Sequence, residues 1–447
     1  MRFPLPQAVL TALDRLHACN HRAYVVGGCV RDDALGIVPK EYDMCTSARP
    51  EQVHACFKGE RVLDTGLQHG TVTLLLGDQS LEITTMRSDG QYSDSRHPDS
   101  VRFSDSLIED LQRRDFTINA MAWNPAEGLV DPFGGMEACQ QKLLIAVGDP
   151  ATRFGEDALR ILRALRFAAT LGFHIDADTY DGMLQQLPGI RHISRERIAK
   201  ELNLLLLGDH AAQTLRRYPR IFMAALPQLE PMLHCPQRSR YHALDVWEHS
   251  LQVLGHTPPQ LALRWSALLH DSGKPVSMTA DSDGRTHFRG HPAVSADIAS
   301  DCLNGLRQPR KLTDRVVLLV THHDDRIQPA TVARWLSRLG PEAFQELAQL
   351  QKADLLAHAP HVHGQAEQLD TMMEQARKLV AEGACLHVRD LKLDGHDLLN
   401  MGYPEGPLLS QGLQAMLDQV LDGHLQNEDA ALRAFADKWL AAERAKT

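Results

Sequence analysis

The hydrophobic pattern of the chain changes near residue 150, and this change restricts the fold more than any other feature. Before it, short β-like runs alternate with turn signals, and the apolar runs 71–76 and 81–85 flank a glycine-containing turn that predicts a β-hairpin. After residue 154, long segments rich in Ala, Leu, Arg and Gln are broken at Pro and Gly, which predicts helices and no further strands. The pattern therefore predicts an α+β fold, with a mixed β-sheet head followed by an all-α remainder.

The chain is too long for one compact core. Its 447 residues predict about three units of roughly 150 residues each. Turn-rich stretches at 208–209, at 227–236 and near Gly383 are candidate joints between helical parts. We therefore expect four parts along the chain: a head over 1–150, a helical neck over 151–235, a helical body over 236–380 and a helical tail over 381–447.

Composition excludes several classes of protein. Hydrophobic residues make up 43% of the chain and charged residues 23%, which is ordinary for a globular protein and argues against disorder. No stretch approaches the roughly 20 apolar residues that span a bilayer, and the N-terminus carries no secretion signal. The eight cysteines form no C-x-x-C pair, so we expect reduced thiols and a cytoplasmic protein without membrane contact. The net charge of −10 requires any surface that binds nucleic acid to be local.

A glycine turn and a carboxylate pair lie close together near the N-terminus. Residues 25–32, VVGGCVRD, predict a strand, a double-glycine turn and a helix whose first N–H groups can face a phosphate. Glu41 and Asp43 are two residues apart, so on a strand both carboxylates point to the same face and can hold Mg²⁺. Each feature alone is more often structural, but together they favour nucleotidyl transfer. Glu82 is either a third carboxylate or a solvent-facing residue, and Arg114 either contacts a triphosphate or belongs to a helix N-terminal charge cluster.

Residues 155–167 predict one amphipathic helix with a charged half. At 100° per residue, this half carries Glu156, Asp157, Arg160, Arg163 and Arg166. It is either a solvated surface with i,i+3 ion pairs or a surface that recognises a base. A carboxylate accepts from the exocyclic amine of cytosine or adenine, and a guanidinium donates to ring acceptors. In the second alternative, this surface selects bases that carry an amino group, without a nucleic-acid template.

Histidines are frequent between residues 242 and 363, and several are spaced like metal ligands. The candidate set is His249, the adjacent His270 and Asp271, then His291 and Asp354. Neutral imidazoles and carboxylates together suit a divalent transition metal. Helical histidines are more often structural, yet the segment HDSGK with spaced histidines on either side favours a metal site. His287, His322 and His323 are additional candidates for a second metal.

Several motifs occur in the order typical of one enzyme family. They are GGCVRD with the following E-x-D, HGTVT (69–73), TTMRSDGQY, RRDFTINAMA, DPFGG (131–135), the EDALR segment and SRERIAKEL (194–202). Over residues 23–210, and more weakly to the C-terminus, the chain resembles the class II tRNA nucleotidyltransferases. Residues 240–360 resemble an HD domain of the metal-dependent phosphohydrolase superfamily.

The resemblance to the nucleotidyltransferases implies a nucleotidyltransferase-type head, a base-selecting neck, and an HD-type body and a tail that hold tRNA. The implied activity is template-independent addition of CCA to the tRNA 3′ end from CTP and ATP. By this resemblance, Gly28, Arg31 and Arg114 bind the nucleotide, Glu41 and Asp43 hold Mg²⁺, and Asp157 and Arg160 recognise the base with Arg163 and Arg166 nearby. The basic residues expected to contact RNA are Arg191, Arg195, Arg197, Lys200, Arg216, Arg217 and Arg220.

One departure from the family and several alternatives qualify this interpretation. The family pair is Asp-x-Asp, and the longer Glu41 implies a shifted metal or lower activity, although we still expect an active enzyme. Poly(A) polymerase shares the head and neck, but its G-R-R-F-type signature is absent from residues 65–73. Enzymes that add only CC or only A share the motifs, and segment 86–103 resembles the loop associated with A addition. An HD phosphohydrolase with a degenerate head, an HD fold that only holds RNA, and a silent RNA-binding protein are the remaining alternatives.

Overall fold

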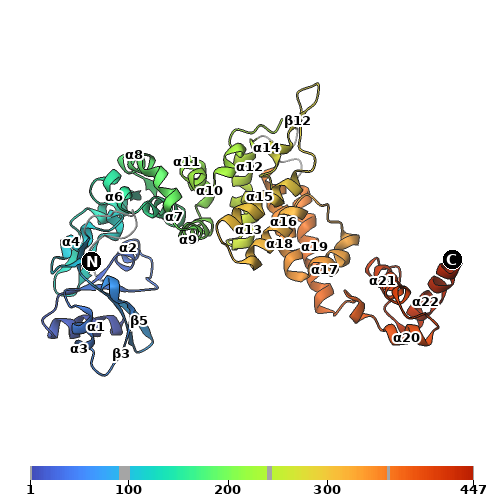
Figure 1. Ribbon diagram of the computed structural model, residues 1–447, viewed down its shortest axis with the longest axis horizontal. Coiled ribbons are helices and arrows are strands. Elements are labelled where there is room, and N and C mark those ends of the chain that lie inside the picture. The colour runs from blue at the N-terminus through green and yellow to red at the C-terminus, as the bar shows by residue number, and fades with distance from the viewer. Residues whose placement is uncertain (1–2, 90–100, 239–243, 360–362, 446–447) are drawn as a thin grey trace. The chain divides into compact units, whose positions relative to one another are not determined.

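The computed structural model describes residues 3–445 except 90–100, 239–243 and 360–362 (Figure 1). Most of the predicted A-addition loop therefore lies outside the described residues. The chain separates into two compact units, Met1–Pro227 and Gln228–Thr447. This division falls at the start of the joint predicted at 227–236, while the finer boundaries at 150 and 380 stay predictions.

The first unit contains a seven-stranded mixed sheet with the strand order β3-β4-β5-β2-β1-β8-β9. Strands β2 and β5 are parallel, and the other neighbours are antiparallel. The predicted hairpin is confirmed, because β4 and β5 pair across the turn at Gly77 and Asp78, where Gly77 has a φ of 59° that favours glycine. The strands of this sheet are β1 (Ala23–Val26), β2 (Asp43–Thr46), β3 (Arg61–Gly66), β4 (Thr71–Leu76), β5 (Gln79–Thr85), β8 (Ala122–Asn124) and β9 (Gly128–Val130).

A short helix, α4 (Leu107–Gln112), packs on the centre of this sheet. Its Leu107 and Leu111 share a buried cluster with Tyr24 and Val26 of β1 and with Cys45 of β2. Burial of these side chains places the residues that follow α4 beside the ends of β1 and β2. The other helices of the unit are α1 (Gln7–Ala18), α2 (Gly28–Ala34), α3 (Pro50–Cys56), α5 (Gly135–Gln141), α6 (Pro150–Glu156), α7 (Leu159–Leu171), α8 (Ala177–Gln186), α9 (Arg195–Leu206), α10 (Ala211–Arg217) and α11 (Pro219–Ala225).

The prediction of one continuous helix over 155–167 is wrong. Helix α6 ends at Glu156 and α7 begins at Leu159, because Asp157 has an extended backbone with φ −146° and ψ 102°. The Asp157 carboxylate accepts a hydrogen bond from the Leu159 N–H at 3.0 Å. A side chain that caps the next helix in this way competes with helix continuation.

The second unit is built almost entirely of helices. A central group, α12 (Val246–His256), α13 (Leu261–Leu269), α15 (His291–Gly305), α16 (Arg310–His322) and α18 (Pro341–Ala357), packs side by side. The remaining helices are α14 (Lys274–Ser277), α17 (Val332–Leu339), α19 (Gly364–Ala381), α20 (Gly395–Asn400), α21 (Pro407–Leu421) and α22 (Asp429–Arg444).

The expectation of no strand after residue 154 is also wrong, although only for two-residue strands. Strand β10 (Leu143–Leu144) pairs with β11 (His174–Ile175), and β12 (Thr279–Ala280) pairs with β13 (Thr286–His287). Two residues per strand are too few for alternation to be visible in the sequence. Strands β6 (Arg87–Asp89) and β7 (Val101–Phe103) form a further small pair in the first unit.

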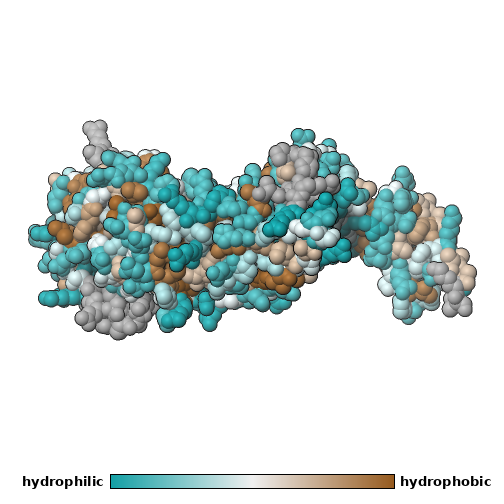
Figure 2. All heavy atoms as spheres, turned by 90° about the horizontal axis from the view of Figure 1, so that it is seen from above, coloured by the Kyte–Doolittle hydropathy of each residue, from teal (hydrophilic) through white to brown (hydrophobic). Residues whose placement is uncertain are grey.

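The surface and the cysteines agree with the composition. Figure 2 shows a face on which hydrophilic residues predominate, with apolar residues in scattered patches. Among the described residues, no helix combines the length and the apolar character that crossing a bilayer requires. All eight cysteines are free thiols, as expected.

Candidate active site and metal centre

The carboxylates of the head meet at one corner of the sheet. Asp43 is the first residue of β2 and lies in register with Glu82 on the parallel neighbour β5. Glu41 precedes the strand instead of lying on it, which corrects the expectation, but Glu41 and Asp43 are both exposed and the intervening Tyr42 is buried. Desolvation raises the pKa of Asp43, the Glu82 and Glu41 carboxylates raise it further, and Arg114 opposes them. Glu82 and Glu41 thus lie near enough to Asp43 to affect its charge, and carboxylate oxygens are the donors that a hard divalent cation prefers.

The glycine turn lies against an arginine. Gly27 has a φ of 74° and precedes α2, and a Cβ at this position would lie 2.9 Å from Arg114 Nη1. A larger residue there would strain the backbone and displace the guanidinium. The backbone therefore requires glycine at Gly27, whereas at Gly28 a Cβ would meet only Arg31 Nη2 at 3.6 Å. The expectation that Gly28 binds the nucleotide stays a prediction.

Arg114 follows α4 and is held by a buried carboxylate. Its Nη2 lies 3.2 Å from Oδ2 of the fully buried Asp110, and Arg113 lies 2.8 Å from the other Asp110 oxygen. Burial alone would raise the pKa of Asp110, but the two guanidinium groups lower it. Arg114 is therefore a fixed positive group beside both the turn and Asp43, and its buried Nε has no hydrogen-bond partner.

Three arginines surround the ring of Phe167 on α7. The guanidinium carbons of Arg31 and Arg163 lie 5.3 Å from the ring centroid, and that of Arg166 lies 4.2 Å away. Arg31 also donates to Asn119 Oδ1 at 2.8 Å and to Asp32 Oδ1 at 2.6 Å. The sequence analysis identified the three arginines but missed Phe167 and Asn119, because neither carries a charge and only the fold brings them here.

A second buried carboxylate links the head to α7. Arg163 Nε donates to Asp115 Oδ2 at 2.7 Å, and Asp115 Oδ1 accepts from Asn119 and from the Phe116 N–H. Although burial acts to raise it, Arg163 and these hydrogen bonds lower the pKa of Asp115 to about 2. This pair connects positions 48 residues apart, so no local pattern could reveal it.

The two residues expected to recognise the base lie at the start of α7 and are both held by neighbours. Asp157 Oδ2 accepts from Arg197 of α9 at 2.8 Å. Arg160 donates to Glu156 at 2.6 Å and to the backbone carbonyls of Arg153 and Arg113 at 2.9 and 3.1 Å. Of the seven residues expected to contact RNA, Arg197 is partly buried and pairs with Asp157, and the other six are exposed. Among the exposed residues, Arg217 contacts His174 at 2.7 Å.

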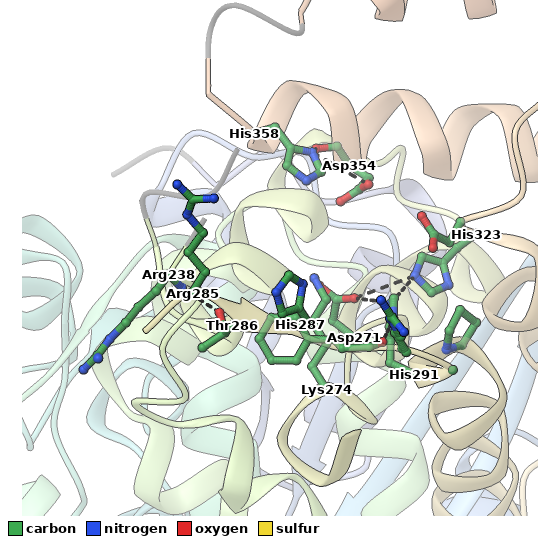
Figure 3. A pocket seen from close by; sticks show the side chains of 15 residues that line it. Arg238, Asp271, Lys274, Arg285, Thr286, His287, His291, His323, Asp354 and His358 are labelled. Carbon is green, nitrogen blue, oxygen red and sulfur yellow. Dashed lines mark hydrogen bonds and ion pairs between the residues drawn. The ribbon is translucent and has the colours of Figure 1, made fainter. Parts of the chain in front are cut away.

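The histidine pattern of the second unit forms a buried cluster. His249 Nε2 lies 2.8 Å from Asp354 Oδ1, and His270 Nε2 lies 3.3 Å from Asp271 Oδ2 and 3.6 Å from Asp354 Oδ1. His291 Nε2 lies 3.2 Å from the other Asp271 oxygen. All five predicted ligands are thus brought together from α12, the segment after α13, α15 and α18. Figure 3 shows three of them, Asp271, His291 and Asp354.

Of the three additional candidate histidines, one belongs to the buried cluster and two do not. His323 joins the cluster, with Nε2 3.1 Å from His291 Nε2. His322 instead bonds to Asp325 at 2.6 Å and packs on Trp335, and His287 is an exposed residue of the pocket rim. His358 at the end of α18, which the sequence analysis missed, lies 3.8 Å from Asp354; the QKADLLAH segment places it four residues after that ligand.

Two observations show that the cluster fits a metal ion. His270 Nδ1 faces the Ala267 carbonyl at 2.9 Å and must donate to it, so the neutral ring presents Nε2 as a lone pair. That Nε2 is buried and has no hydrogen-bond partner. Burial alone would lower the pKa of His270, but Asp271 and Asp354 raise it to about 10. A cation is required here, whether a proton or a metal.

The cluster lies in the floor of a pocket of about 670 Å³. Lys274 Nζ lies 2.6 Å from Asp271 Oδ2, and Figure 3 shows Arg238 and Arg285 across the pocket from His323. Arg289 also lines the pocket. Arg238, Arg285 and Arg289 form a positive rim of the pocket above the buried imidazoles and carboxylates. This arrangement suits an anionic ligand such as a phosphate ester.

The class of protein that these features define is a nucleotidyltransferase. Acidic residues at the sheet corner lie beside a glycine turn of the kind that faces phosphates and beside several arginines. A family model described as "Poly A polymerase head domain" matches residues 23–145, and one described as "Probable RNA and SrmB- binding site of polymerase A" matches 172–229. A model for tRNA nucleotidyltransferase domain 2 matches 294–436.

Full-length relatives identify the family. The CCA-adding enzyme of Leuconostoc mesenteroides is 46% identical over 442 residues, covering 98% of each chain, and that of Limosilactobacillus fermentum is 34% identical over 431 residues, covering 96% of each. The chain belongs to the CCA-adding enzyme family of tRNA nucleotidyltransferases. The crystal structure of the Bacillus stearothermophilus CCA-adding enzyme in complex with CTP is similar, with a TM-score of 0.75, 28% identity and 99% of both chains covered. The Thermotoga maritima CCA-adding enzyme complexed with tRNA shares the fold at 18% identity, with a TM-score of 0.63.

Proposed function

We propose that the protein adds CCA to the 3′ end of tRNA, using CTP and ATP and no template. Family membership over the whole chain carries this proposal, and the acidic corner at Asp43 beside Gly27 and Arg114 supports it. The poly(A) alternative rests on the family models over residues 23–145 and 172–229, whereas curated relatives that match 96% or more of the chain are CCA-adding enzymes.

In this proposal Glu41 and Asp43 hold Mg²⁺, with Glu82 as a further oxygen donor. When bound, Mg²⁺ supplies charge neutralisation at the phosphates and at the attacking hydroxyl. Gly28 and Arg31 bind the nucleotide at the start of α2, and Arg114 adds a fixed positive charge. The tRNA 3′-hydroxyl attacks the α-phosphorus, a new oxygen to phosphorus bond forms, and pyrophosphate leaves with the electrons of the broken bond.

Base selection is assigned to Asp157 and Arg160, with Arg163 and Arg166 close by. Their ion pairs in the structure hold the Asp157 carboxylate and the Arg160 guanidinium in fixed orientations, which is what recognition of an amino group and a ring acceptor requires. The exposed residues Arg195, Lys200 and Arg220 are proposed to bind RNA phosphates. We expect affinity for tRNA to fall steeply with salt, and a flat dependence between low and moderate salt would contradict a phosphate-binding surface.

The decisive experiment supplies tRNAs that end before CCA, after C, and after CC. Purified protein with Mg²⁺ receives CTP and ATP singly and together, and the products are resolved on a sequencing gel. The proposal predicts addition of CCA followed by arrest. A ladder of adenosines would identify a poly(A) polymerase. Partial addition would indicate an enzyme that adds only CC or only A, and no incorporation would indicate a degenerate head.

A second activity is supported by the histidine cluster. We propose that His249, His270, Asp271 and Asp354 hold a divalent transition metal and that the pocket hydrolyses phosphate esters as an HD-type site. The buried Nε2 of His270, which lies between the Asp271 and Asp354 carboxylates, and the positive residues that line the pocket favour this over a cluster that only stabilises the helices. Release of phosphate from p-nitrophenyl phosphate in the presence of Mn²⁺, Co²⁺ or Ni²⁺ tests it. Activity should be lost in His249→Ala and kept in the rim variant His287→Ala.

A further inference from the structure

Phe167 on α7 contacts arginines from two different helices of the first unit. Arg163 and Arg166 belong to α7 itself, whereas Arg31 belongs to α2, the helix that follows the glycine turn. All three guanidinium carbons lie within 5.3 Å of the ring centroid, and Phe167 is only 7% exposed. The ring therefore joins the helix expected to recognise the base to the helix expected to bind the phosphates.

Three positive groups around one ring repel one another. Burial lowers the pKa of Arg166, and its Glu201 partner opposes this effect. The charges of Arg163 and Arg31 lower the same pKa further. Each guanidinium has one carboxylate partner, namely Asp32 for Arg31, Asp115 for Arg163 and Glu201 for Arg166, at 2.6, 2.6 and 3.0 Å. The face of an aromatic ring carries negative charge density, so Phe167 attracts all three guanidinium groups at once.

The ring of Phe167 is itself held by buried aromatic residues. It stands edge-on to Phe116, with the ring centroids 5.9 Å apart and an angle of 84° between the ring planes. Phe116 is fully buried and packs in turn on Phe154 of α6, with the centroids 6.4 Å apart. Edge-on contacts of this kind are the preferred geometry of aromatic pairs. Because the ring is packed in this way, it determines where the guanidinium groups lie and does not follow them.

The hydrogen bonds of Arg31 lie within the head. Its Nη1 donates to Asn119 Oδ1 at 2.8 Å, and its Nε and Nη2 donate to Oδ1 of the adjacent Asp32 at 2.9 and 2.6 Å. The contact with Phe167 adds a partner from α7. A leucine at this position would fill a similar volume but has no negative face, so Arg31 would lose the attraction that holds it beside α7.

We propose that Phe167 is a positioning residue for nucleotide binding, whose ring holds the Arg31 guanidinium in place for the phosphates of the nucleotide that α7 recognises. This inference rests on the proposed CCA addition and deepens it, because it adds an uncharged residue of α7 to the binding of the triphosphate. Since Phe167 acts through Arg31, its ring affects how tightly a nucleotide binds and not the rate of the chemical step. The effect is equal for CTP and ATP, because the phosphates are common to both.

The test changes the charge on the ring face with little change in its shape. Phe167 is replaced in the full-length protein by phenylalanines that carry one, three and five fluorine atoms, because each fluorine withdraws electrons from the ring and weakens its attraction for a cation. KM and kcat for CTP and for ATP are measured with tRNAs that end before CCA and after CC. We expect KM to rise stepwise, by about tenfold in total and equally for both nucleotides, while kcat changes by less than about twofold.

Two controls show whether the effect belongs to this ring and to Arg31. In an Arg31→Gln background, the same series should change KM by less than about twofold, because the group through which the ring acts has been removed. The same fluorinated residues at Phe154, which is also buried and packs on Phe116, are the matched control and should leave KM unchanged. Phe167→Leu should raise KM as much as the ring with the most fluorine atoms.

The outcomes separate this inference from the function on which it rests. An active parent protein whose KM stays constant across the series would overturn the positioning role, and CCA addition would stand. A stepwise rise that persists in the Arg31→Gln background would also overturn it, because the ring would then act through Arg163 or Arg166. A parent protein that incorporates neither nucleotide would overturn the proposed function and this inference with it. Circular dichroism of each variant confirms that the helices are intact, so changes in KM are assigned to the ring.

Discussion

The two candidate sites of this protein differ in how complete they are before a ligand arrives. In the head, Glu41, Asp43 and Glu82 are exposed at the sheet corner. Among the described residues, several sets of three or more possible ligand atoms lie within 4.8 Å of one another, and none of these sets includes the three carboxylates. In the second unit, such groups include His249 and Asp271, which are both 1% exposed. If both sites bind metal as proposed, the head would need substrate phosphates to complete the coordination, whereas the histidine cluster already brings several donor atoms together.

On the proposed function, exposed carboxylates would hold a metal that arrives with the nucleotide, and buried imidazoles would hold a metal that stays bound. Mg²⁺ keeps several waters and binds through one or two carboxylates plus substrate phosphates. Imidazoles fixed by second hydrogen bonds to backbone carbonyls are preorganised for a transition metal. Two predictions test this contrast, and two more test the charged contacts of Asp157 and Asp115.

Removing one carboxylate of the head should have the largest effect. We expect Asp43→Ala to lower nucleotide addition by about 10³-fold, because a metal ion contributes several kcal/mol to stabilisation of the transition state. Glu41→Gln should lower it less, since Glu41 precedes the strand and is less constrained. Single-turnover incorporation of CMP measures both, with the exposed turn variant Asp78→Ala as the control. Unchanged incorporation in Glu41→Gln would remove that residue from the metal site.

Exchanging the metal ion should affect the reactions of the two units differently. After chelation, Mg²⁺ alone should restore nucleotide addition but leave phosphate release at least about tenfold low, because imidazole sites favour transition metals and Mg²⁺ favours oxygen ligands. Adding Mn²⁺ or Co²⁺ should then restore phosphate release. If Mg²⁺ alone restored both reactions equally, the contrast between the sites would be wrong.

Discrimination between bases should depend on Asp157 at the start of α7, which pairs with Arg197. We expect Asp157→Ala to reduce the preference for CTP and ATP over UTP and GTP by about 10- to 100-fold, since one well-placed pair of base contacts contributes about 1–3 kcal/mol. Competition assays with mixed triphosphates measure the ratio, and Asp178→Ala on the surface of α8 is the matched control. Retained discrimination would exclude Asp157 from base recognition.

The smallest expected effect is on stability and depends on pH. Because the pKa of Asp115 is lowered to about 2, its pair with Arg163 stabilises the folded state fully above the unfolded value of 3.8 and loses this effect as pH falls towards 2. Asp115→Asn should cost about 2 kcal/mol at pH 7 and progressively less below pH 4. Urea unfolding at several pH values measures the difference, with Asp14→Asn on α1 as a control. A difference that grows towards low pH would contradict the assignment.

Parts of both sites could be predicted because their signals are local. The hairpin of β4 and β5 follows from alternation and a glycine turn, and the spacing predicted that His249 and Asp354 lie in one cluster. Other parts depend on long-range packing. The break at Asp157 arises from a cap on the next helix, and the partner of Arg163 lies 48 residues away, so a helical projection placed these side chains on one continuous face.

The sequence by itself determined the kinds of groups available, namely oxygen donors near a glycine turn in the head and imidazoles with carboxylates in the body. Residue type and short spacing carry this information, since they depend only on neighbouring positions. Only the tertiary structure decided which atoms converge: that Gly27 lies against Arg114, and that the two oxygens of Asp271 face different histidines. The physical reason is that backbone carbonyls and helix packing orient each ring, and these partners come from segments that the chain brings together only when it folds.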